Sequence, residues 1–334
     1  MKHLFFIHSH TLFLTSIGVV DYLNLPHKDV LFVYSRNYKT TIPTDIESVD
    51  ISNQMEDTFY IMLSWSRRNF FYNKKIRDDL VSFFDDFVQE HTSGRAYRLY
   101  IPHLQHHAFQ IMATNPRCDE IFFIQEGGRA MIPLQTGKIS FLNAVYNKLI
   151  LHNDSRVWKC SNWFPNEHTP YSRPVKAFAF DKDYFCDAPE QTILVKWPHI
   201  PISVSIDEQR PFFLLEGAVE LGQVEGNLYN NAVKVLINEF AESKNYIKFH
   251  PAQKAEARHL ILNMFKEKKC EVEELPMDIP FELIVVNFHN LKLYGFGTSL
   301  LFYGKSFGHH VVSRENLLMK SKRYRIYSKG LAKL

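Results

Sequence analysis

The feature that most constrains the fold of this 334-residue chain is an alternation of short apolar runs with helical patterns. In the first half, apolar runs occupy residues 3–7, 29–34, 98–101 and 120–124, and helical spacing is clear in residues 80–88 and 103–112. Continuous apolar runs of this kind are typical of strands buried on both faces of a parallel sheet. Helices between such strands cover the two faces. We therefore predict an α/β sheet with helices on both sides.

A second alternation begins at Pro211, after a stretch at residues 153–202 that is rich in tryptophan and proline and lacks regular periodicity. Strand-like runs at 212–217, 246–249 and 291–295 alternate there with helical patterns at 231–242 and 255–268. We predict an α/β fold of two Rossmann-like domains facing a central cleft, in which ligands bind beyond the carboxyl ends of the strands. The expected limits are 1–205 for the first domain with its linker, 206–315 for the second domain, and 316–334 for a basic tail.

The charge balance argues against one class of partner. Lys and Arg total 39 against 36 Asp and Glu, so the net charge is +3, which is too small to indicate a nucleic-acid-binding protein. The C-terminal residues from Met319 onward depart from this average and carry six Lys or Arg and no acid. Such a segment is either a solvated basic face or a contact for an anionic inner-membrane surface or an acidic glycan.

Cysteine usage and the N-terminal stretch bear on location. The four cysteines are widely spaced without a CxxC pair, which argues against a zinc site or a disulfide framework and favours a reducing compartment. The apolar stretch at residues 2–20 is interrupted early by His8, Ser9, His10 and Thr11, and no small-residue cleavage site follows. A buried strand running into a helix is expected there rather than a signal peptide or membrane span. We expect a cytoplasmic protein, with the basic tail available for peripheral contact with the inner membrane.

Three polar clusters follow expected strands. Glu126 lies in the run Gln-Glu-Gly-Gly that starts at residue 125, and His250-Pro251 ends the strand-like run at 246–249. Thr298-Ser299 follows a Gly-Phe-Gly turn, where backbone N–H groups and hydroxyls can bind a phosphate. Taken singly, these residues also suit an exposed turn, a surface histidine and an ordinary helix N-cap.

Taken together, the clusters indicate a transfer reaction. A carboxylate from the first half can serve as base for an acceptor hydroxyl, while a histidine and hydroxyls from the second half stabilise a departing phosphate. Displacement at an activated sugar nucleotide needs both kinds of group.

At these residues the sequence resembles the bacterial HP-motif sialyltransferases, a group that includes lipooligosaccharide sialyltransferases and polysialyltransferases. That family has an acidic-acidic-Gly motif, a His-Pro motif and a hydroxyl pair, which match Gln125-Glu126-Gly127, His250-Pro251 and Thr298-Ser299. Phe281-Glu282-Leu283 matches a further element before the hydroxyl pair, and Phe-Ile-His-Ser-His at residues 6–10 is also similar to the family. The order of these short motifs, over residues 125–299, makes the resemblance specific.

The resemblance implies a GT-B fold and an inverting sialyltransferase that uses CMP-sialic acid as co-substrate, with no metal and no other cofactor. The acceptor would be a bacterial surface glycan, lipooligosaccharide or capsule. Glu126 would be the general base and His250 would assist departure of CMP. Glu282 would bind the ribose, Thr298 and Ser299 the phosphate with Gly297 and Pro251 beside them, and Gly217 would let the cytidine approach. Where relatives have a first acid this chain has Gln125, an amide that cannot act as a base.

Weaker candidates have plainer explanations. Asp181-Lys182-Asp183 has the spacing of a metal-binding triplet but suits a turn at a strand end, and His103 and His107 are four apart but suit a core or cleft-lining role. Arg67 and Gly127 are expected on the acceptor side. Two other functions stay open: a GT-B transferase with a different nucleotide sugar, and a catalytically silent nucleotide- or glycan-binding protein. The acceptor glycan, the linkage and the processivity are not encoded in these motifs.

Overall fold

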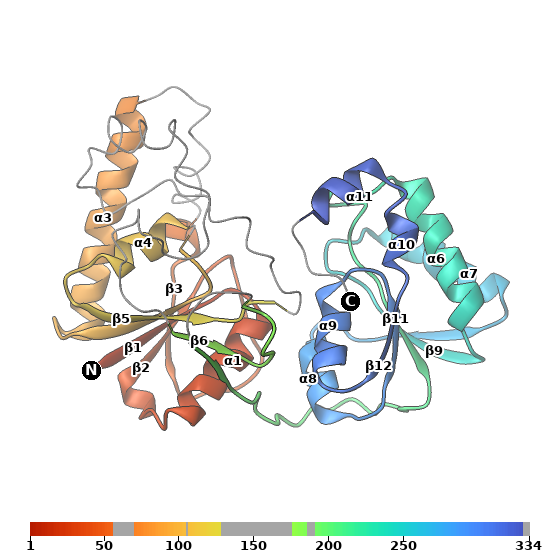
Figure 1. Ribbon diagram of the computed structural model, residues 1–334, viewed down its shortest axis with the longest axis horizontal. Helices are drawn as coiled ribbons and strands as arrows, with labels where there is room; N and C mark the ends of the chain where they lie inside the picture. Colours follow the sequence, from red (N-terminus) through yellow and green to blue (C-terminus); the bar gives the residue numbers. More distant parts are fainter. Residues whose placement is uncertain (56–69, 105, 128–175, 186–190, 330–334) are drawn as a thin grey trace. The chain divides into compact units, whose positions relative to one another are not determined.

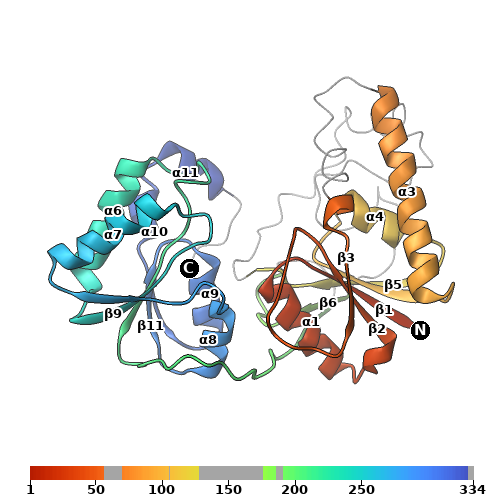
Figure 2. The same cartoon turned by 180° about the vertical axis from the view of Figure 1, so that it is seen from behind.

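The computed structural model describes residues 1–55, 70–104, 106–127, 176–185 and 191–329 (Figures 1 and 2). The chain forms two compact units. Unit 1 contains Met1–Glu126 and the described part of Pro133–Pro198, and unit 2 contains the described part of His199–Leu334 together with Gly127. The change from one unit to the other at residues 198 and 199 lies close to the predicted limit at residue 205.

Unit 1 is built on a seven-stranded sheet with the order β3-β2-β1-β4-β5-β6-β7. Its strands are β1 (Lys2–Ile7), β2 (Val30–Tyr34), β3 (Glu47–Asp50), β4 (Tyr97–Ile101), β5 (Cys118–Ile124), β6 (Lys176–Ala179) and β7 (Gln191–Leu194). Every neighbouring pair is parallel. All six residues of β1 are buried, as expected for a central strand that is covered on both faces.

Helices cover both faces of this sheet. They are α1 (His10–Tyr22), the short 3₁₀ helix η1 (His27–Asp29), α3 (Phe70–Thr92) and α4 (His107–Ala113). Figures 1 and 2 show α1 on one face, with α3 and α4 on the other. The predicted strand-to-helix passage at the N-terminus is confirmed, since β1 leads through Ser9 into α1. The helix expected at 103–112 is shorter and starts at His107, because the His106 side chain caps it there.

Unit 2 is built on a five-stranded parallel sheet with the order β10-β9-β8-β11-β12. Its strands are β8 (Pro211–Leu214), β9 (Lys244–Lys248), β10 (Glu271–Glu274), β11 (Lys292–Gly295) and β12 (His310–Ser313). Its helices are α6 (Gly226–Phe240), α7 (Ala255–Glu267), α8 (Phe281–Asn287), α9 (Ser299–Ser306), α10 (Glu315–Leu318) and α11 (Lys322–Tyr327). Both views show α6 and α7 on one face of the sheet, with α8 and α9 on the other.

The C-terminal segment is folded onto unit 2 as far as the structure describes it. Tyr324 is fully buried in the same apolar cluster as Phe213 and Val233, and its hydroxyl donates to Glu315 Oε1 at 3.2 Å. Most of residues 316–329 therefore lie in α10 and α11, and the Tyr324 side chain anchors them to the core of unit 2. Of the helices in the described ranges, none is long and apolar enough to cross a membrane.

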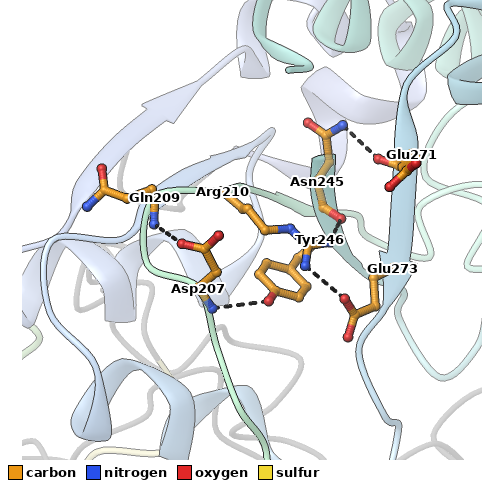
Figure 3. Close-up of polar contacts among 7 residues, drawn as sticks. All are labelled: Asp207, Gln209, Arg210, Asn245, Tyr246, Glu271 and Glu273. Carbon is orange, nitrogen blue, oxygen red and sulfur yellow. Dashed lines mark hydrogen bonds and ion pairs between the residues drawn. The ribbon is translucent and has the colours of Figure 1, made fainter. Parts of the chain in front are cut away.

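The chain enters the second sheet through Arg210, at the amino end of β8 (Figure 3). The Arg210 guanidinium lies 3.7 Å from the centre of the Tyr246 ring, pairs with Glu273 at 2.9 Å and donates to the Asn245 carbonyl at 2.9 Å. The Tyr246 hydroxyl accepts from the Asp207 N–H at 3.1 Å. These contacts tie β8, β9 and β10 together at the amino edge of the sheet.

Both sheets reverse their strand order at one point. In the sheet of unit 1, β2 and β3 follow one another outward from β1 on one side, and β5, β6 and β7 follow outward from β4 on the other. In the sheet of unit 2, β9 and β10 follow outward from β8, and β12 lies outside β11. In open α/β sheets, ligands bind beyond the carboxyl ends of the strands at such a switch point. The residues that follow β1 and β4, and those that follow β8 and β11, are therefore where a site is expected in each unit.

Candidate functional site

His250 lies just beyond β9 in a tight turn. The Gln253 N–H donates to the His250 carbonyl at 2.9 Å, so residues 250–253 form a turn with Pro251 at its second position, where a fixed φ is favoured. The Ala252 N–H donates to His250 Nδ1 at 3.1 Å. Because a backbone amide can only donate, Nδ1 holds a lone pair, and the proton of the neutral ring is on Nε2. The turn thus fixes the tautomer and makes Nε2–H the donor that is available to a ligand.

Gly217, beyond β8, leaves room for this ring. A Cβ atom at Gly217 would lie 2.9 Å from His250 Nδ1 and 3.3 Å from Ala252 Cβ, which is too close for the present arrangement. The His250 side chain is therefore the neighbour that requires glycine at position 217. The role of Gly217 toward a cytidine, expected from the sequence, stays a prediction.

The hydroxyl pair lies at the start of α9, beyond β11. Thr298 is the N-cap residue, and its side-chain oxygen accepts from the Leu300 N–H at 3.3 Å, which leaves its hydroxyl hydrogen able to donate. Ser299 is the first residue of the helix and is partly exposed. Gly297 is buried, and its N–H donates to Glu216 Oε1 at 3.4 Å. The helix N-terminus therefore carries two hydroxyls beside backbone donors, as a phosphate-binding turn requires.

Glu216 was not among the sequence candidates. Its side chain is largely buried at the end of β8, and its backbone carbonyl accepts from the Tyr229 hydroxyl at 2.8 Å. Together with Gly217 it links the two motif loops, since Glu216 bonds Gly297 and Gly217 faces His250. An acid directly before a glycine at a strand end was the signal that could have found it.

Lys248 organises the loop before α8. Its ammonium group donates to the carbonyls of Pro276 and, at 3.0 Å, of Ile279. Burial lowers the pKa of Lys248, and the nearby carboxylates, Glu282 first among them, oppose that effect. Glu282 lies in the first turn of α8 and is partly exposed. The loop that presents Glu282 is thus held at the carboxyl end of β9, two residues before His250.

Burial also affects His250. Burial lowers the pKa of His250 below the ordinary histidine value, and the charge of Glu220 opposes this only in part. In the protein without ligand the ring is accordingly more often neutral than a free histidine. A bound phosphate dianion would raise its pKa and favour the charged donor.

In unit 1, Glu126 lies beyond β5 and pairs with His8 from the end of β1. His8 Nε2 lies 3.2 Å from Glu126 Oε2, and the two side chains are 8% and 16% exposed. Burial alone would raise the pKa of Glu126, but the hydrogen bond from His8 and the charges of His103, His8 and Arg36 outweigh it and lower the pKa to about 2. At neutral pH the group is a carboxylate held by the imidazole of His8.

Other groups from neighbouring strand ends surround this pair. Burial, ahead of all charges, lowers the pKa of His103 to about 4 and that of His106 well below its usual value. Both rings are therefore neutral near pH 7, and the charge of His103 on Glu126 matters only in acid. Arg36 lies just beyond Ser35, which follows β2, and has a left-handed backbone (φ 56°), an uncommon conformation for a residue other than glycine. No role was predicted for His8, although it lies in the Phe-Ile-His-Ser-His element at residues 6–10, nor for Arg36, which belongs to no such motif.

Gln125 has a structural contact that explains an amide at this position. It is fully buried, and its Oε1 accepts from the N–H groups of Phe180 and Asp181, each at 3.1 Å. The side chain thereby fastens the end of β5 to the end of β6. Asp181 in turn accepts from the Asp183 N–H at 2.9 Å, so the Asp-x-Asp triplet forms a turn, as the sequence indicated.

Some predicted residues add less. Arg67 lies outside the described residues. At Gly127 an added Cβ would meet no described atom within 4 Å.

Within the described ranges no group of three His, Cys, Asp or Glu side chains is placed to hold a metal ion. A pocket of about 380 Å³ lies between α6 and α10, and its lining residues are Leu228, Asn231, Ala232, Val235, Leu317 and Lys320, none of which is a predicted site residue.

Comparison with solved structures bears on the fold. The chain is similar to the spinosyn rhamnosyltransferase SpnG complexed with thymidine diphosphate, with a TM-score of 0.54 and 11% identity over 92% of this chain and 79% of that one. The chain has the GT-B fold. The predicted α/β class with two Rossmann-like domains is thus confirmed, while the shared cleft stays a prediction.

Two further structures are more distant. A sialyltransferase from Photobacterium damsela has a TM-score of 0.46 and 12% identity, covering 98% of this chain and 78% of that one. S. aureus MnaA, in a structure with UDP, has a TM-score of 0.47 and 13% identity, covering 94% and 79%. No protein-family model matches the chain, and a search of curated proteins gives no match.

Proposed function

We propose that this GT-B protein is an inverting sialyltransferase that moves sialic acid from CMP-sialic acid to a bacterial surface glycan. One observation carries the proposal: two consecutive residues at the end of β8 contact the two motif loops of unit 2. Gly217 faces the His250 ring, and Glu216 bonds the N–H of Gly297 next to the hydroxyl pair. The His-Pro and Thr-Ser motifs, 47 residues apart between Pro251 and Thr298, therefore meet at one sheet edge (298 − 251 = 47).

This edge has the groups that a nucleotide phosphate needs. His250 offers an oriented Nε2–H, and Thr298 and Ser299 offer hydroxyls at a helix N-terminus, where negative charge is favoured. As the bond from the anomeric carbon to the phosphate oxygen breaks, these donors would stabilise the negative charge that builds on CMP. Glu282 would bind the ribose hydroxyls. We propose no metal and no further cofactor.

On the acceptor side we propose the pair of Glu126 and His8 as the group that activates the acceptor hydroxyl, with Gly127 and Arg67 near the acceptor. A lipooligosaccharide or capsule glycan is the proposed acceptor class.

We also propose a peripheral contact of α11 with an anionic inner-membrane surface, on the cytoplasmic side. Ile326 and Tyr327 are 66% and 42% exposed on this helix, beside the exposed basic residues Lys322, Arg323 and Arg325. An apolar pair flanked by basic side chains suits an interface of lipid headgroups.

The test is a transfer assay with CMP-sialic acid over a panel of glycan acceptors, with CMP-Kdo and UDP-sugars as competing donors. We expect turnover with CMP-sialic acid and a loss of about 100-fold or more in His250→Ala, in line with removal of a positioned acid or donor. His259→Ala, an exposed histidine of α7, is the matched control and should keep full activity.

Three results would contradict the proposal. Preference for a UDP-sugar would indicate a different transferase. Binding of CMP without transfer or donor hydrolysis would indicate a silent binding protein. An equal loss in His250→Ala and His259→Ala would remove His250 from the site.

A further inference from the structure

The His8–Glu126 pair lies at the switch point of the first sheet. His8 follows β1, which has β2 on one side and β4 on the other, so the strand order reverses beside it. Glu126 follows β5, and the two side chains meet at 3.2 Å through Nε2 and Oε2. Ser9 caps α1 through the Leu12 N–H and donates to the Glu126 carbonyl at 3.5 Å. Both members of the pair are thus positioned by regular elements.

A carboxylate held in this way is a weak proton acceptor. The pKa of Glu126, lowered to about 2, is far below the pH at which a cytoplasmic enzyme works. A general base is most effective when its pKa is near the working pH. The His8 contact that stabilises the carboxylate also occupies one of its two oxygens, Oε2.

We infer that His8 is the catalytic base for the acceptor hydroxyl and that Glu126 is a positioning residue which orients its ring. This inference rests on the proposed transferase function and changes the role that the sequence motif implied for Glu126. With Nε2–H donated to Glu126, the lone pair of His8 is on Nδ1. Among the residues that the structure describes, none forms a hydrogen bond with that Nδ1.

The proton and electron balance is simple. The acceptor oxygen forms a bond to the anomeric carbon, and the bond from that carbon to the phosphate oxygen breaks, with its electron pair leaving on CMP. The hydroxyl proton moves to His8 Nδ1. The imidazolium that forms is stabilised by the adjacent carboxylate of Glu126, so the charge developed in the transition state is compensated inside unit 1.

Three other charged or titratable groups interact with the pair. They are His103 beyond β4, His106 at the start of α4, and Arg36 beyond β2. His103 and Glu126 titrate near pH 4 and pH 2, and His106 also titrates well below its usual range. A loss of activity near neutral pH would therefore not come from His103, His106 or Glu126.

The test compares His8→Gln, Glu126→Gln and the double variant in the full chain, with the exposed His27→Gln as control. We expect kcat to fall about 100-fold or more in His8→Gln, about tenfold in Glu126→Gln, and no further in the double variant than in His8→Gln. The KM for CMP-sialic acid should stay within about threefold, and imidazole in the buffer should partly restore His8→Gln. His27→Gln should match the wild type.

The ring tautomer separates the alternatives. We expect nitrogen NMR at pH 7.5 to show His8 protonated on Nε2. A larger loss in Glu126→Gln than in His8→Gln, or a proton on Nδ1, would overturn the inference. If the wild type turned over another nucleotide sugar instead, the donor would be wrong, and the same variants assayed with that sugar would still test His8.

Discussion

Gly217 shows how a single missing side chain shapes the candidate site. The His250 ring is held by the Ala252 N–H on one nitrogen, so it cannot turn aside without losing that bond. Gly217 lies against the same nitrogen. A glycine here is explained by its small size rather than by an unusual backbone angle, and the effect of an added methyl group is therefore local to His250.

We predict that Gly217→Ala displaces the His250 ring and lowers kcat/KM for CMP-sialic acid by about tenfold, a cost of roughly 1 to 2 kcal/mol for forcing a side chain from its rotamer. The measurement is steady-state kinetics together with CMP binding by calorimetry. Gly226→Ala is the matched control, because its nearest neighbour would be Val219 Cγ1 at an ordinary 3.8 Å. Equal activity in the two variants would show that the ring position is unimportant.

At the scale of elements, the loop between β10 and α8 depends on β9. Lys248 reaches from the end of β9 to two carbonyls of that loop, those of Pro276 and Ile279. A buried ammonium that donates to neutral carbonyls is worth more than an exposed ion pair, because removing it leaves the acceptors without a partner. Glu282 begins the helix that follows, so its placement depends on a lysine in another strand.

We predict that Lys248→Met loosens residues 275–282 and costs about 2 kcal/mol of the free energy of unfolding. Hydrogen exchange should quicken in that loop, and CMP should bind more weakly. Lys292→Met serves as control, since Lys292 is half-exposed and pairs with the exposed Glu242 at 3.1 Å, a contact worth at most about 1 kcal/mol. If both variants exchanged alike in residues 275–282, Lys248 would have no special part in holding the loop.

At the scale of the whole molecule, the second unit has a complete sheet and core of its own. All five strands lie between residues 211 and 313, and the apolar cluster joins α6, α7 and the C-terminal helices through residues such as Val233, Phe265 and Tyr324. The Arg210 network fixes the amino edge of the same sheet. Each of these contacts is formed within unit 2.

We predict that a fragment of residues 199–334 folds cooperatively and binds CMP with an affinity within about tenfold of the full chain, as expected for a domain with its own core. Circular dichroism during urea unfolding and calorimetry with CMP would test this. A fragment that unfolds without a cooperative transition would show that unit 2 depends on unit 1. A folded fragment without CMP affinity would place the nucleotide site elsewhere.

Several features of this protein were readable from particular stretches of sequence. The runs at 4–7, 30–34 and 121–124 are apolar throughout because those strand segments are buried on both faces, and this indicated the parallel α/β class. The edge strands β3, β7, β10 and β12 were missed, because half-exposed strands such as Glu-Val-Glu-Glu at 271–274 show no long apolar run. The loops with His250 and Thr298 were placed correctly at strand and helix ends, since proline and glycine mark such turns.

The sequence by itself determined the fold class and the position of each motif along the chain, because burial and turn geometry act on neighbouring residues. Only the tertiary structure decided which side chains meet. His8 pairs with Glu126, Gly217 contacts His250, and Glu216 bonds Gly297. The physical reason is that a parallel sheet brings the carboxyl ends of strands from distant parts of the chain to one edge. Which side chains contact one another at that edge, and how their charges interact, depends on strand order and packing. A local sequence pattern does not predict either.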